Sequence, residues 1–237
     1  MNPAQSAATS QPLLSIRALR YTWSGDAMPV INGLELDVEA GQRVFLAGAS
    51  GSGKSTLLAL IGGLLAPDSG SIHFAGTDLG ALSGSARDRF RADHLGVIFQ
   101  QFNLMPWLSA VANVRLGCQF SRQRRHHAGD AERAAHELLS AMGLAEDRWN
   151  RRADELSVGQ QQRVAAARAL IGQPDLVLAD EPTSALDVDH RDTFVDLLFE
   201  QARRAGSAIL FVSHDRSLAP RFDMTRELGE INAGSMA

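Results

Sequence analysis

The sequence predicts an α/β domain built on a mostly parallel sheet, and two observations carry this expectation. Short apolar runs alternate along the chain with longer helical patterns, as they do where strands are joined by crossover helices. The 237 residues are 45% hydrophobic and 21% charged, which is the composition of an ordinary folded domain with a sizeable core. We therefore expect one α/β domain with smaller β-rich and helical parts.

Each expected element follows from a local pattern. Between about 102 and 156 the pattern becomes helical, so we expect a helical insertion there. Within it, the charged run at 121–130 is interpreted as a solvated loop, because acidic residues directly follow its arginines and histidines. The expected strands are Leu13–Tyr21, Leu34–Val38, Arg43–Ala47, Ser71–Ala75, Leu176–Ala179 and Ala208–Val212, and the expected helices are Lys54–Leu65, Val111–Leu116, Ala131–Leu144 and Val188–Ala205.

Composition also excludes several classes of protein. The net charge of −4 and the pI near 6.0 argue against a nucleic-acid partner, which usually requires a basic surface. No apolar run is long enough to span a bilayer. The single cysteine, Cys118, excludes an internal disulfide and fits a reducing, cytoplasmic compartment. Residues 1–12 lack the pattern of a signal peptide and are expected to form a disordered tail, which leaves 13–237 as the domain.

A glycine-rich segment after the strand at 43–47 predicts a phosphate-binding loop. It matches G-x-x-x-x-G-K-S/T at every fixed position, and it lies between an apolar strand and an apolar helix. Its lysine, Lys54, is the only lysine among 23 basic residues, and we expect it to reach the β- and γ-phosphates. Ser55 would ligate Mg²⁺, and Thr56 would bond the α-phosphate. The expected nucleotide-binding residues here are Gly48, Ala49, Ser50, Gly51, Ser52, Gly53, Lys54, Ser55 and Thr56.

An acidic pair follows the apolar strand at 176–179. Carboxyl ends of strands are where α/β sheets place ligands, so Asp180 is expected to hold Mg²⁺ through its water shell. Glu181 is expected to act as general base toward the attacking water. Such a pair is common by itself, but downstream of a phosphate-binding loop it predicts nucleotide hydrolysis.

The segment LSVGQQQ at 156–162 resembles the signature motif of ATP-binding cassette proteins. Ser157 and Gln160 have capping-box spacing and are expected to open a helix that runs to about Ile171. In that family the signature of one subunit caps the γ-phosphate held by another, so Ser157, Gly159 and Gln160 are expected to bind nucleotide. Val158 departs from the pattern, which usually has glycine at this position.

The resemblance extends over about Leu13 to Gly234 and assigns further residues. Asp187 matches the family's D-loop, His214 its switch histidine, and Gln100 the glutamine that senses Mg²⁺ and water. Tyr21 matches the position of an aromatic ring that stacks on adenine, with Trp23 as the alternative. The family's fold is a P-loop NTPase core with a mostly parallel sheet, an antiparallel β subdomain and an inserted α-helical subdomain. It implies ATP, Mg²⁺ and a homodimer of cassettes.

The stretch from 87 to 114 looks like the macrolide-export and lipoprotein-release branch of the family. That branch implies an ATPase on the inner face of the cell membrane that drives a separate permease, for export or mechanotransmission of lipid, lipoprotein, peptide or drug. Four apolar residues would either line the groove for the permease or pack in the helical part; they are Phe102, Leu104, Met105 and Trp107. The alternative is a non-transport cassette ATPase acting on a cytosolic macromolecular partner, but such chains typically carry two cassettes or long insertions.

Overall fold

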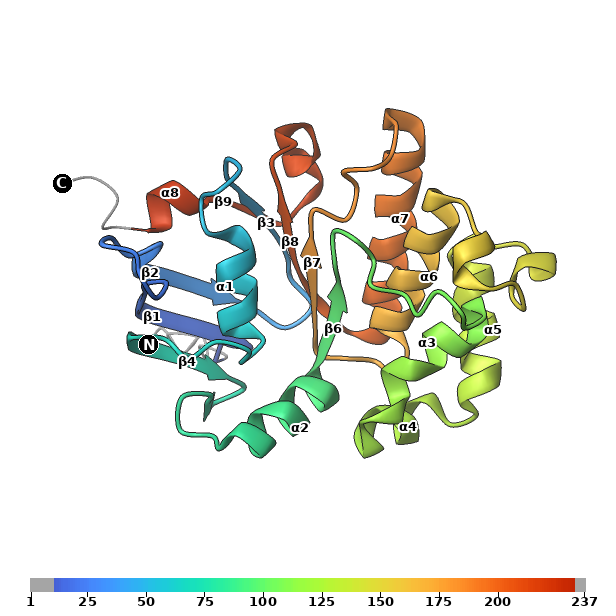
Figure 1. Cartoon of the computed structure of the whole chain (residues 1–237), viewed down its shortest axis with the longest axis horizontal. Helices are drawn as coiled ribbons and strands as arrows, with labels where there is room; N and C mark the ends of the chain where they lie inside the picture. The colour runs from blue at the N-terminus through green and yellow to red at the C-terminus, as the bar shows by residue number, and fades with distance from the viewer. Residues whose placement is uncertain (1–10, 233–237) are drawn as a thin grey trace, which may run out of the picture.

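A computed structural model describes residues 11–232 and contains two sheets (Figure 1). The parallel sheet has the strand order β6-β7-β8-β3-β9, and the antiparallel sheet has the order β2-β1-β4-β5. The predicted combination of parallel and antiparallel sheets is therefore confirmed. In chain order the strands are β1 Leu14–Tyr21, β2 Ile31–Val38, β3 Arg43–Ala47, β4 Ser69–Phe74, β5 Thr77–Asp78, β6 Leu95–Ile98, β7 Leu176–Asp180, β8 Ala208–Ser213 and β9 Met224–Glu227.

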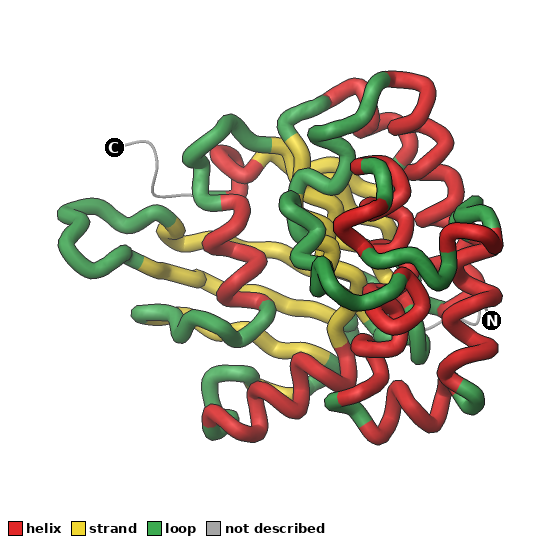
Figure 2. The backbone as a smooth tube through the Cα atoms, turned by 45° about the vertical axis from the view of Figure 1, so that its right-hand side comes forward, coloured by secondary structure: helices red, strands yellow, loops and turns green. Residues whose placement is uncertain are grey.

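The helices divide between the two sides of the parallel sheet (Figure 2). Helix α1 lies beside the antiparallel sheet, whereas α3 to α7 gather on the other side. No helix within the described part of the chain is both long and apolar enough to cross a membrane. The helices are α1 Lys54–Ile61, α2 Gly84–His94, α3 Ala110–Gln119, α4 Arg122–Ala128, α5 Ala131–Ala141, α6 Val158–Leu170, α7 Val188–Ala205 and α8 Leu228–Ile231, with 3₁₀ turns at Glu146–Arg148, Ala153–Glu155 and Arg216–Arg221.

The central strands are apolar on both faces, as expected for a parallel sheet covered on two sides. Along β3, Val44 and Leu46 pack into one core cluster with α1 and the antiparallel sheet. Phe45 and Ala47 point the other way and pack with α6 and α7. The alternation follows from the two-residue period of a strand, and it gives the domain two cores separated by one sheet.

Local sequence signals account for most element boundaries. The strand at 43–47 and the helix at 188–205 are confirmed at the residues predicted. Helix α7 is capped by Asp187, whose side chain accepts a hydrogen bond from the His190 amide at 3.0 Å. Helix α1 ends at Ile61, four residues earlier than expected, because Gly62 and Gly63 follow it. The limits of the disordered tail and of the helical subdomain remain predictions, and residues 1–10 lie outside the described residues.

The prediction of a solvated loop at 121–130 was wrong. Residues 122–128 form helix α4, and the side chain of Arg124 is only 4% exposed. Its guanidinium donates to the carbonyl oxygens of Ile171 at 2.9 Å, Ala169 at 2.6 Å and Leu95 at 3.1 Å. These carbonyls belong to the end of α6 and the start of β6. A single charged side chain therefore joins the helical part to the sheet.

Candidate active site

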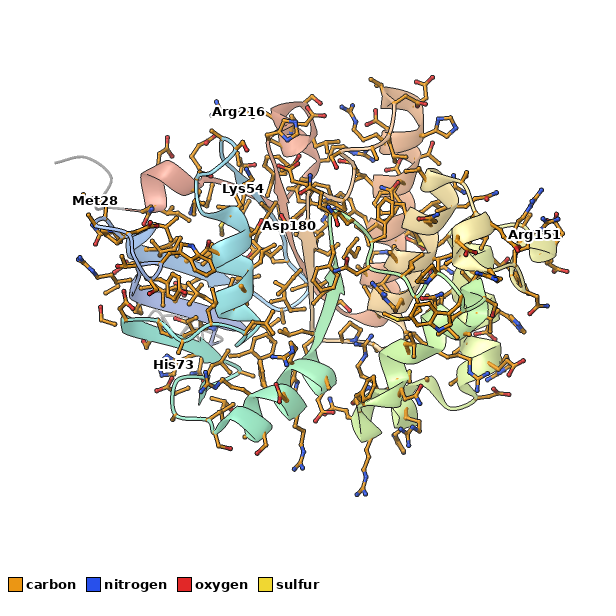
Figure 3. The ribbon with its side chains drawn as sticks, in the orientation of Figure 1. Met28, Lys54, His73, Arg151, Asp180 and Arg216 are labelled. Atoms are coloured by element: carbon orange, nitrogen blue, oxygen red, sulfur yellow. The ribbon has the colours of Figure 1, made fainter. Side chains whose placement is uncertain are left out.

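A cavity of about 640 Å³ opens where the phosphate-binding loop and α1 meet the carboxyl ends of the parallel strands. Figure 3 shows Lys54 at the start of α1 and Asp180 at the end of β7, and both residues line this cavity. Most of the lining residues were predicted from the sequence as nucleotide or metal contacts. The cavity is lined by Trp23, Asp26, Val30, Ser50, Gly51, Gly53, Lys54, Ser55, Thr56, Gln100, Asp180, Glu181 and His214.

The phosphate-binding loop requires glycine for its backbone path. Gly51 and Gly53 have φ angles of +79° and +97°, in the left-handed region that favours glycine. A Cβ atom on Gly53 would also lie 3.1 Å from a methyl group of Val30. The loop carries Gly48, Ala49 and Ser52 as predicted, although these three residues do not line the cavity.

Lys54 lies beside Glu181 in the wall of the cavity. Its ammonium donates to the carbonyl oxygens of Gly48 at 2.7 Å and Ala49 at 2.8 Å, and it lies 3.6 Å from Oε1 of Glu181. Both side chains are largely buried yet line the cavity. A phosphate anion entering the cavity can therefore replace the carboxylate as the partner of this ammonium.

Glu181 is oriented by the end of β8. Ser213 donates its hydroxyl to Oε2 at 3.0 Å, and the His214 amide donates to Oε1 at 3.1 Å. The Nδ1 atom of the His214 ring also lies 2.9 Å from Oε2. Glu181 has a φ of +44°, an uncommon backbone conformation for a residue with a side chain. The carboxylate is thus fixed in the wall of the cavity, between the ends of β7 and β8.

Asp180 provides an oxygen suited to a hard cation. Burial raises the pKa of its carboxyl group, while a hydrogen bond from Ser55 and the charge of Lys54 oppose that effect. Its Oδ1 atom is buried and has no hydrogen-bond partner among residues 11–232. Oxygen donors of this kind are the ligands of Mg²⁺, so Asp180 and Ser55 fit the predicted metal site. Gln100 lines the same cavity.

The two aromatic residues considered for adenine stacking lie in different surroundings. Trp23 lines the cavity, and its indole nitrogen lies 3.4 Å from the hydroxyl of Thr56. Tyr21 packs against the core and touches Trp23 edge to face. Two lining residues, Asp26 and Val30, had no signal in the sequence, because they reach the cavity only through the fold of the 22–30 segment.

The signature residues do not line this cavity. The capping box is present: the Gln160 amide donates to the Ser157 hydroxyl at 3.4 Å, and the Ser157 amide donates to the Gln160 side chain at 3.0 Å. Val158 at the start of α6 is 50% exposed. Gly159 and the D-loop residue Asp187 are likewise absent from the wall of the cavity.

The fold and this site together define a P-loop nucleotide hydrolase. A family model described as ABC transporter matches residues 31–184, which is more than half of the chain. The chain therefore belongs to the ABC transporter family and is an ATP-binding ATPase subunit of that family.

Related proteins refine this placement. The chain is 44% identical over 223 residues to the lipoprotein-releasing system ATP-binding protein LolD of Novosphingobium aromaticivorans, covering 93% of the chain and 98% of LolD. It is 43% identical over 218 residues to the macrolide export ATP-binding/permease protein MacB of Rhodopseudomonas palustris, covering 91% of the chain but 32% of MacB.

A solved structure has the same arrangement of elements. The ATP-binding cassette MJ0796, solved as a dimer in a post-hydrolysis state with ADP and Pi, superposes with a TM-score of 0.82 at 32% identity. The comparison covers 90% of this chain and 93% of that one. The cavity described above is thus set in a fold that holds hydrolysed nucleotide in a relative.

Proposed function

We propose that this chain hydrolyses ATP to drive a separate membrane permease of the lipoprotein-releasing or export type. The observation that carries the proposal is the cavity that brings Lys54, Asp180, Glu181 and His214 together. The alignment over nearly the whole length of LolD supports a lipid-modified protein as the cargo. The chain would then act at the inner face of the cell membrane.

The chemistry follows from the positions of the side chains. Lys54 and the loop amides hold the phosphates, and a Mg²⁺ ion held by Ser55, Asp180 and Gln100 would supply positive charge at their oxygens. Glu181 accepts the proton of the attacking water, because its carboxylate lines the cavity beside Lys54. His214 and Ser213 keep that carboxylate oriented. The barrier is lowered by positioning and charge rather than by a covalent intermediate.

We propose Trp23, rather than Tyr21, as the residue that stacks on adenine. Only Trp23 of the two lines the cavity. Trp23→Ala should weaken ATP binding by about tenfold, since stacking on a base contributes about 1–3 kcal/mol, whereas Tyr21→Leu, which also removes a ring, should leave binding unchanged. Equal losses in both variants, measured by calorimetry, would argue against the assignment.

The position of the signature residues supports a head-to-tail dimer with two ATP molecules at its interface. Ser157, Gly159, Gln160 and Asp187 lie away from the cavity of their own chain, so they are free to close the cavity of a second copy. Glu181→Gln retains the phosphate contacts but removes the base, and the ATP-bound dimer should accumulate. Light scattering with Mg-ATP tests this, and a strictly monomeric variant would contradict the assignment of Glu181 as the base.

The permease would dock on the helical side of the molecule. Phe102 is buried and Leu104 packs against the core, so these two residues are removed from the groove suggested by the sequence. Met105 and Trp107 are 37% and 64% exposed, and we propose that they contact the permease. A second, apolar cavity of about 450 Å³ lies along α3. It is lined in part by Leu108 and Leu116, which follow Met105 and Trp107 in the chain.

A charged substitution tests this contact. Trp107→Glu should abolish association with the permease in a pull-down while circular dichroism and ATP binding stay unchanged, because the side chain is exposed. An unfolded variant would place Trp107 in the core instead. Co-purification of the wild-type chain with a cytosolic assembly, rather than with membranes, would support the non-transport alternative.

A further inference from the structure

A strained turn follows the cavity residue Gln100. Phe102 and Asn103 have φ angles of +58° and +48°, so two consecutive residues with side chains adopt the left-handed backbone. Within the turn, the Phe102 amide donates to the Phe99 carbonyl at 2.9 Å and the Asn103 amide donates to the Gln101 carbonyl at 2.6 Å. Such a conformation persists only where the surroundings hold it in place.

One side chain of α6 holds this turn from outside. The guanidinium of Arg168 donates to the Asn103 carbonyl through Nη1 and to the Phe102 carbonyl through Nη2, both at 2.6 Å. Burial lowers the pKa of Arg168, yet an arginine remains charged at neutral pH. The planar fork of the guanidinium matches two successive carbonyls, so the contact fixes direction as well as distance.

We infer that Arg168 is a positioning residue that ties helix α6 to the turn carrying Gln100, and thereby sets where Gln100 lies in the nucleotide cavity. Helix α6 is capped by the signature residue Ser157 and carries Arg168 near its other end. Under the proposed function, on which this inference rests, Ser157 contacts the nucleotide of the second copy. Helix α6 thereby connects that contact with the turn beside the chain's own Gln100.

The end of α6 is itself anchored. Arg124 donates to the carbonyls of Ala169 and Ile171, immediately after Arg168 in the chain. A Cβ atom on Gly172 would lie 2.5 Å from the Arg124 carbonyl, so the chain leaves α6 through a space that admits only glycine. Because this end of α6 is fixed against α4, Arg168 presents its guanidinium to the turn from a set position.

The variant Arg168→Lys tests the inference in the full-length protein. A lysine ammonium is a compact charge and cannot donate to both carbonyls with the geometry of the guanidinium fork. We expect kcat for ATP hydrolysis to fall about tenfold through misplacement of Gln100. KM for ATP should stay within about twofold, because the phosphate loop is untouched. Hydrogen exchange of the segment 99–105 should rise, since the turn loses its external partner.

Arg163→Lys is a matched control. Arg163 lies on the same helix and donates to two successive carbonyls, Met142 at 3.1 Å and Gly143 at 2.8 Å, but these lie at the end of α5. We expect faster exchange near 142–145 alone, with kcat within about twofold of the wild type. If Arg168→Lys fails to fold, kcat and the hydrogen exchange of 99–105 are measured on Arg168→Gln instead.

The outcomes separate this inference from the proposed function. Unchanged kcat and exchange in Arg168→Lys, or equal losses of kcat in the Arg163 and Arg168 variants, would overturn the positioning role. A wild-type protein that hydrolyses no ATP would overturn the proposed function instead. In that case exchange at 99–105 would still show whether Arg168 holds the turn.

Discussion

Lys54 and Arg124 are two buried cations of this molecule, and their charges are satisfied in different ways. Lys54 is 8% exposed and faces a cavity, with two carbonyls and the Glu181 carboxylate around its ammonium. Arg124 is 4% exposed, and its guanidinium donates to the backbone carbonyls of β6 and of the end of α6. The first cation is next to open space, and the second is enclosed by packed backbone.

The difference shows how burial separates a functional charge from a structural one. An incoming anion can take the Glu181 place beside Lys54, so the ammonium is available for binding. Arg124 has its donors directed at main-chain oxygens that α6 leaves unpaired at its C-terminal end. Burial lowers the pKa of Arg124 to about 10, which still leaves it protonated at neutral pH.

The largest expected effect is the loss of activity in Lys54→Ala. Removing the ammonium withdraws charge from the phosphates, so ATP hydrolysis should fall by about 100-fold or more. The free energy of unfolding should change little, because Ser213 and His214 still bind Glu181. Phosphate-release assays and thermal unfolding measure the two quantities. If Lys54→Ala still hydrolyses ATP, Lys54 is not a functional cation, and the contrast with the structural cation Arg124 fails.

Arg124→Met should give the opposite result. The substitution leaves the carbonyls of Leu95, Ala169 and Ile171 without donors, which should lower the free energy of unfolding by roughly 3 kcal/mol. Activity per folded molecule should stay within about threefold of the wild type. Arg125→Met is the control, since that neighbouring side chain is exposed and its loss should not change stability. A stable Arg124→Met protein would show that the carbonyls find other partners.

The smallest expected effect is the change in stability caused by Asp180→Asn. Because burial raises the pKa of Asp180 in the folded state, the ionised carboxylate destabilises the metal-free protein at neutral pH. This penalty is complete above the raised pKa and disappears below the ordinary aspartate value of about 4. Asp180→Asn should therefore raise the unfolding midpoint by about 2 °C at neutral pH in EDTA, with no gain in acid, while abolishing hydrolysis.

The control for this substitution is an exposed carboxylate. Asp223→Asn, at an aspartate whose pKa is lowered by Arg43, should instead reduce stability at neutral pH. Its contribution is present above the ordinary aspartate pKa and is lost as the pH falls through the lowered value. Equal shifts in the two variants would mean that burial does not govern the stability effect at Asp180.

The sequence by itself determined the elements whose signals are local. The strand at 43–47, the glycine-rich loop and the helix that follows are set by consecutive residues, and the same holds for the capping box at Ser157 and Gln160. The acidic pair Asp180 and Glu181 could be predicted for the same reason, because it directly follows the apolar residues of β7. The helical insertion was predicted from the change of pattern at about 102–156, whereas the antiparallel pairing of the early strands came from the family resemblance.

Only the tertiary structure decided which distant residues meet. The run at 121–130 has the composition of a solvated loop, yet Arg124 is buried because carbonyls 45 and 47 positions away accept its donors. Trp23 reaches the cavity while Tyr21 packs beneath it, and Arg168 holds the turn after Gln100 from 65 residues away. Hydrogen bonds to backbone carbonyls carry no side-chain signature in the sequence, so these contacts could not be predicted from it.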